Sequence, residues 1–230
     1  MPKHDVYLEV GKTKIIAAAV DWPGWCRIAK TEAAALDALA DCGPRYAQAL
    51  ERVGLRLSPP DGAGDLRVVE RITGNATTDF GAPDIPTSSD GEPIDAAALE
   101  RFLAIMDACW DALLAAGEAA RGKELRKGPR GGGRELEKIY GHVLDAQRGY
   151  LNRIVWKAAP VTGEDVFAQV AAVRQDARDG LTRAAREGLP EQGPRGGKVW
   201  PARYFVRRSA WHILDHAWEI EDRLSPAEKV

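Results

Sequence analysis

The 230-residue sequence has no apolar run near the roughly 20 residues that a membrane-spanning helix requires. It contains only three cysteines, Cys26, Cys42 and Cys109, which is too few for a disulfide framework, and its first residues lack the apolar stretch of a signal peptide. We therefore expect a cytoplasmic protein that does not enter a membrane. The 32 basic and 34 acidic residues leave a net charge of −2, which argues against nucleic acid as a partner.

The first 74 residues combine strand and helix patterns. β-rich runs at residues 6–10, 14–20, 25–29 and 66–72 predict four strands. An Ala- and Leu-rich run after Thr31 predicts one helix, which Pro44 should kink or end early. The expected fold of residues 1–74 is an α+β domain with the order β-β-β-α-β. Residues 75–94 are rich in Gly, Pro, Ser, Thr and Asp, and we expect them to form a linker.

Beyond residue 94 the pattern changes to long amphipathic helices. Four helices are expected, starting near residues 95, 134, 164 and 201 and separated by loops rich in Gly and Pro. Because helices of this length bury their apolar faces against one another, residues 95–230 are predicted to form an all-α four-helix bundle.

Histidine is scarce, and three of the four histidines lie in two of these helices. His212 and His216 are four residues apart, so both imidazoles project from one face of the last helix. His142 lies on the second helix of the predicted bundle. Three imidazoles suit one divalent transition metal and leave positions open for water or substrate. Zinc and nickel are the metals we expect first, and iron or manganese second. The alternative is that the histidines merely pack in the core or lie at the surface.

Three carboxylates follow these histidines at helical spacing. Glu219 lies three residues after His216 and is a candidate acceptor for an imidazole N–H, or a general base. Asp145 and Asp215 each follow a histidine by three residues and are alternatives for the same role. The simpler interpretation is a solvated helix flank, with Glu219 paired to Arg223.

Two aromatic residues and two basic stretches complete the set of candidates. Tyr150 and Trp211 are candidates for the wall of a pocket, although aromatics at this spacing are more often core residues. Six basic residues fall within 121–134 and five within 195–208, just before or at the start of the helices that carry the histidines. If the helices alternate in direction, both stretches meet at one end and attract an anionic ligand. The contacts would be Arg130, Arg134, Arg203 and Arg207, and ordinary charged loops are the alternative.

The ending from Trp211 to Arg223, together with His142, makes residues 95–225 resemble the DinB/YfiT family of helical-bundle metalloproteins. The resemblance implies that His142, His212 and His216 form one metal site. Relatives in that family include transferases and isomerases that use bacillithiol or mycothiol. The resemblance therefore implies a bacterial metal-dependent transferase, isomerase or hydrolase with a small-molecule substrate and a low-molecular-weight thiol.

Residues 5–73 resemble the HicB antitoxin fold, on the strand before the Asp21–Gly24 turn and on the helix start Thr31-Glu32-Ala33-Ala34. No DNA-binding helix pattern remains in the chain, so the resemblance does not imply an antitoxin. The expected roles of this domain are to cover the bundle, to bind a small ligand or to make an oligomer contact such as a homodimer. The alternative to an enzyme is a non-enzymatic binding or regulatory protein, in which a HicB-like module is joined to a metal-binding or structural bundle.

Overall fold

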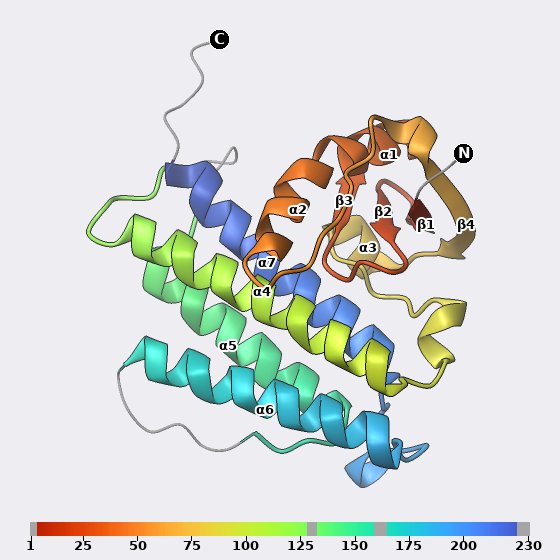
Figure 1. Ribbon diagram of the computed structural model, residues 1–230, viewed down its shortest axis with the longest axis vertical. Helices are drawn as coiled ribbons and strands as arrows, with labels where there is room; N and C mark the ends of the chain where they lie inside the picture. Colours follow the sequence, from red (N-terminus) through yellow and green to blue (C-terminus); the bar gives the residue numbers. More distant parts are fainter. Residues whose placement is uncertain (1–3, 128–132, 159–164, 225–230) are drawn as a thin grey trace. The chain divides into compact units, whose positions relative to one another are not determined.

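The structure, a computed structural model, describes residues 4–127, 133–158 and 165–224. A small sheet near the N-terminus is followed by a helical region (Figure 1). The chain divides into two compact units, of which the first comprises Met1–Ala108 and Pro201–Trp211 and the second Cys109–Trp200 and His212–Val230. The domain limits 1–74 and 95–230 stay a prediction.

The first unit contains a four-stranded sheet with the order β3-β2-β1-β4. The strands are β1 (His4–Val10), β2 (Ile15–Ala19), β3 (Cys26–Ala29) and β4 (Leu66–Thr73). The first three pair antiparallel in sequence order, whereas β4 lies parallel to β1. A parallel neighbour requires a crossover connection, and the chain supplies it through helices α1 and α2 between β3 and β4.

The helix predicted after Thr31 is two helices, α1 (Glu32–Asp41) and α2 (Gly43–Glu51). Thr31 caps α1, because its hydroxyl accepts a hydrogen bond from the Ala34 N–H at 3.2 Å. Pro44 lies in the first turn of α2, where its missing N–H leaves no helix bond unmade. The interruption that Pro44 predicts is therefore confirmed.

Both faces of the sheet are buried at the strands β1 and β2. Successive residues of a strand face opposite sides, and Tyr7 and Leu8 of β1 are each at most 1% exposed. Tyr7 joins Ile16, Ala18 and Cys26 in a cluster against which Trp211 packs. Helix α1 packs on β2 and β3. The cysteines Cys26, Cys42 and Cys109 are buried, and none forms a disulfide.

The segment 75–94, expected to be a linker, carries local structure. It contains the short helix α3 (Ala76–Phe80) and the 3-10 turn η2 (Ser88–Gly91). Asn75 caps α3 by accepting hydrogen bonds from the N–H groups of Thr77 and Thr78. A composition rich in turn-forming residues concealed this helix, because five residues are too few for a periodic pattern.

A buried carboxylate ties this segment to the sheet. Glu9 of β1 is fully buried and accepts hydrogen bonds from the Thr78 hydroxyl at 2.5 Å and from the Asp84 and Ile85 N–H groups at 3.0 and 3.2 Å. Burial raises the pKa of Glu9, and these hydrogen bonds oppose the rise. The carboxylate thus fixes the chain that leads into the helical region.

The helical region contains α4 (Ala96–Ala120), α5 (Leu136–Arg153), α6 (Val166–Glu187) and α7 (Ala202–Leu224). Helices α5 and α6 lie side by side in the second unit (Figure 1). Helix α5 ends at Arg153, and Val155, two residues later, has a left-handed φ of 57°. No helix among the described residues has the length and apolar character needed to cross a membrane.

One glycine of α4 is required by the packing of the second unit. The Tyr140 hydroxyl of α5 donates a hydrogen bond to the Leu113 carbonyl at 3.3 Å. A Cβ atom at Gly117 would lie 1.9 Å from that hydroxyl oxygen, so only glycine permits this close approach. The contact seats α5, which carries His142, against α4.

Candidate metal centre

The three histidines singled out from the sequence lie together in the second unit. His142 comes from α5, and His212 and His216 come from successive turns of α7. One ligand atom from each lies within 4.8 Å of the others, and the ring centroids are 4.8–5.0 Å apart. His212 and His216 are buried, and His142 is half-buried. Two helices therefore present three imidazoles to one point.

The spacing of the donor atoms fits a shared metal ion. Nε2 of His142 and Nε2 of His212 are 3.2 Å apart. Two nitrogens bound to one metal at about 2.0–2.1 Å stand roughly 2.8–3.4 Å apart in octahedral (cis) or tetrahedral coordination. Side chains at 3.2 Å therefore need little movement to bind a cation between them, and neutral imidazoles are the donors that transition metals prefer.

Glu219 orients the third imidazole. Its Oε2 lies 2.8 Å from Nδ1 of His216, three residues earlier on α7. A carboxylate at this position accepts a hydrogen bond from the Nδ1–H group, so the proton stays on Nδ1 and Nε2 of His216 keeps its lone pair for a metal. This hydrogen bond lowers the pKa of Glu219, and the nearby charge of Arg223 adds to the effect while burial opposes it.

Arg223 holds Glu219 in turn and anchors the basic stretch. Its Nη1 donates to Oε1 of Glu219 at 3.0 Å and to the Arg134 carbonyl at 2.7 Å, and its Nε donates to the Arg126 carbonyl at 2.6 Å. Gly133 has a φ of +150°, and a Cβ atom there would lie 2.6 Å from Nη2 of Arg223. The sequence indicated the Glu219–Arg223 pair, but the bonds to distant carbonyls carry no sequence signal.

The electrostatic environment favours neutral imidazole. Burial lowers the pKa of His142, and the positive charges of His216 and Arg134 lower it further. A neutral ring keeps its lone pair for a metal, whereas a protonated ring cannot bind one. The second unit therefore holds His142 in the form that metal binding requires.

Aromatic rings border His212. The Tyr150 ring centroid lies 5.8 Å from that of His212, and Trp200 lies 5.1 Å from Tyr150. The backbone N–H of Trp200 donates to the Arg153 carbonyl at 2.9 Å, which fixes the chain at this position. Trp211, the second aromatic candidate, packs with the Tyr7 cluster of the first unit. The neighbour that sequence reasoning missed is Trp200, which lies far from Tyr150 in the chain.

The two aspartates face solvent. Asp145 is 82% exposed in its side chain and lies 3.5 Å from Arg148. Asp215 is exposed as well. Glu219, one of the three carboxylates singled out from the sequence, forms a hydrogen bond to His216 of the cluster.

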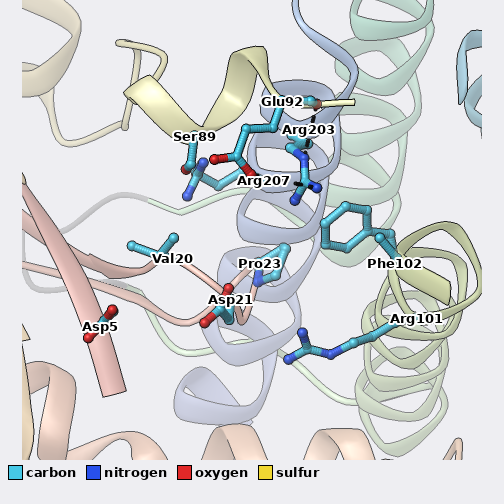
Figure 2. Close-up of a pocket in the computed structure, with 11 residues that line it drawn as sticks. Asp5, Val20, Asp21, Pro23, Ser89, Glu92, Arg101, Phe102, Arg203 and Arg207 are labelled. Atoms are coloured by element: carbon cyan, nitrogen blue, oxygen red, sulfur yellow. Dashed lines mark hydrogen bonds and ion pairs between the residues drawn. The ribbon is translucent and has the colours of Figure 1, made fainter. Parts of the chain in front are cut away.

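The four arginines considered as anion contacts belong to different parts of the chain. Arg134 is exposed in the second unit, and its positive charge contributes to the lowered pKa of His142. Arg130 lies outside the described residues. Arg203 and Arg207 belong to the first unit, where they line a cavity (Figure 2). Arg207 is buried against Asp90, and Arg203 donates to the Glu92 and Pro93 carbonyls at 3.1 and 2.9 Å.

Comparison with known proteins supports the identity of the helical region. A family model described as the DinB superfamily matches residues 105–220, which is half of the chain and includes all three histidines. Searches of curated proteins and of solved structures gave no match. The site geometry and the family match agree, and the chain belongs to the DinB superfamily.

Proposed function

We propose that the chain is a metal-dependent enzyme of the DinB-like class, in which His142, His212 and His216 hold one divalent transition metal inside a four-helix bundle. The convergence of three imidazole donor atoms within 4.8 Å carries the proposal. Zinc and nickel suit this donor set best, and iron or manganese are alternatives. Three protein ligands leave coordination positions open, as in catalytic rather than structural sites.

The reaction proposed is the transfer or addition of a small thiol to a small electrophilic substrate. When bound, the metal would lower the pKa of a thiol and so supply the nucleophile at neutral pH. The thiol sulfur forms a bond to an electrophilic carbon, the thiol proton passes to solvent or to a base, and a leaving group or π-bond takes the displaced electron pair. An isomerisation assisted by the same thiol would use the same residues.

The side chains around the site have separate tasks in this proposal. Glu219 holds the Nδ1 proton of His216 and so keeps Nε2 directed at the metal. Tyr150, beside His212, borders the space for a substrate, and Trp200 supports its ring. The positive charge of Arg134 favours a thiol or substrate that carries a carboxylate or phosphate.

An activity assay tests the reaction. Protein loaded with zinc or nickel is incubated with a chromogenic aryl halide and with cysteine, bacillithiol or mycothiol. The reaction is followed by the change in absorbance or by the halide released. We expect turnover that depends on metal and thiol, is lost in His142→Ala and is retained in Asp145→Asn. Full metal loading without turnover of any thiol would contradict the enzyme and favour a binding or regulatory protein.

For residues 1–74 we propose a HicB-like fold that acts as a ligand-binding or oligomer module. The order of three antiparallel strands, helix and returning parallel strand supports this fold. Molar mass by light scattering tests the homodimer, and a monomer at micromolar concentration would contradict it.

A further inference from the structure

A cavity of about 250 Å³ lies within the first unit. Five parts of the chain line it: β1, the turn after β2, the region of η2, the start of α4 and the start of α7 (Figure 2). It is somewhat smaller than the roughly 300–1,000 Å³ of pockets for drug-sized ligands. Its size suits a small metabolite.

Six charged side chains line this cavity, and four of them have partners. The pairs are Asp5 with Arg67, Arg207 with Asp90, and Arg203 with Glu92. The bond between Asp5 and Arg67 is bidentate at 2.5–2.6 Å, and both members of the Arg207–Asp90 pair are buried. These pairs balance their own charges, so they leave little net field for a ligand.

The remaining two charges, Arg101 and Asp21, have opposite signs. Neither forms an ion pair or a hydrogen bond with any residue that the structure describes. The Arg101 guanidinium lies over the Trp22 ring, with its central carbon 4.2 Å from the ring centroid. A guanidinium in contact with an aromatic ring can still donate its N–H groups to a carboxylate.

The view of the cavity shows how these groups lie. The Arg101 side chain extends from α4 toward the side on which Asp21 lies, and the Phe102 ring borders the same space (Figure 2). Val20 and Pro23 add apolar surface next to Asp21. The cavity thus offers one positive group, one negative group and an apolar wall.

We propose that this cavity binds a small zwitterion, an α-amino acid with an apolar side chain. The ligand carboxylate accepts hydrogen bonds from Arg101, the ligand ammonium donates to Asp21, and the side chain contacts Phe102. A ligand with both charges completes both unpaired groups, whereas a simple anion leaves Asp21 beside a second negative charge. The site lies in the unit that the family match covers least, and it does not depend on the metal centre.

Calorimetric titration of the full-length chain tests the proposal with L-leucine and two matched analogues. N-acetyl-L-leucine lacks the ammonium charge and L-leucinamide lacks the carboxylate. We expect saturable binding of leucine and at least about tenfold weaker binding of each analogue, because each loses one charge-assisted contact. Equal binding of N-acetyl-L-leucine would overturn the proposal in favour of a plain anion site.

Variants locate the site. Arg101→Gln and Asp21→Asn should each weaken leucine binding at least about tenfold. Arg71→Gln is the matched control, because Arg71 pairs with Glu32 at 3.1 Å and does not line the cavity. Unchanged circular dichroism would show that the exchanged chains fold. Absence of saturable heat at millimolar leucine, or equal binding by both variants and the control, would refute the assignment.

Discussion

Nδ1 of His216 lies 2.8 Å from Oε2 of Glu219, one turn further along α7. The other oxygen of Glu219 accepts a hydrogen bond from Arg223 at 3.0 Å, one more turn along. Imidazole, carboxylate and guanidinium thus follow each other on a single helix face. Because all three are set by helical spacing, the helix itself fixes the direction of the imidazole.

Removal of the negative charge at Glu219 tests this relationship. Glu219→Gln should weaken zinc binding about 10- to 100-fold, because the imidazole loses its charged acceptor. Competition with a chromogenic zinc chelator gives the affinity. Asp145→Asn is the control and should bind zinc like the wild type, since Asp145 faces solvent. Equal affinities for all three proteins would show that Glu219 does not support the site.

Gly133 provides a test of the Arg223 anchor. Gly133 has a φ of +150°, which L side chains rarely adopt, and an alanine Cβ there would also meet Nη2 of Arg223 at 2.6 Å, so Gly133→Ala should destabilise the protein by about 1–3 kcal/mol. Gly141→Ala is the matched control, because Gly141 is an exposed helical residue of α5 with no atom near its added Cβ. It should stabilise by roughly 0.5–1 kcal/mol. Urea unfolding measures both changes, and a neutral Gly133→Ala would argue against the anchor.

Gln147 should be a site where a polar residue costs stability. Its side chain is fully buried in α5, and neither Nε2 nor Oε1 has a hydrogen-bond partner among the described residues. Gln147→Met removes this desolvation penalty at similar volume and should stabilise by about 1–2 kcal/mol. The exposed Gln175→Met should change the free energy of unfolding by less than about 0.5 kcal/mol. A destabilised Gln147→Met would show that the amide has a partner after all.

The pH dependence of stability should reveal the raised pKa of the Glu9 carboxyl group. Burial raises its pKa in the folded state above the unfolded value, so the folded state binds the proton more tightly. The stability of the wild type relative to Glu9→Gln should therefore rise as the pH falls from about 7 to about 5. Thermal melts of both proteins measure this difference. A difference that stays constant or shrinks on acidification would contradict the raised pKa.

Local spacing explains why the histidine cluster could be predicted from the sequence. The i, i+4 pair His212 and His216 and the i, i+3 neighbour Glu219 share a face on any helix. His142 required the further step that its helix faces α7, which the predicted four-helix bundle supplied and the family resemblance supported. The interruption at Pro44 was equally readable, because proline restricts the backbone of its own residue.

Partners brought together by tertiary packing could not be predicted in this way. Trp211 has the helical spacing of a pocket residue, yet it packs on Tyr7 of the sheet. Arg207 was singled out as an anion contact, and its ion pair with Asp90 in the first unit has no signal in the sequence spacing. Neither the Trp200–Tyr150 contact nor the carbonyl partners of Arg223 follow from sequence spacing, because distant segments supply them.

Metal content measures the central claim most directly. Purified wild type, His142→Ala and Asp215→Asn are incubated with zinc, nickel, iron(II) or manganese, dialysed and analysed for metal by mass spectrometry. The account predicts about one ion per chain in wild type and Asp215→Asn, and no stoichiometric metal in a folded His142→Ala. Wild type that retains none of the four metals, or His142→Ala that retains metal as tightly, would contradict it.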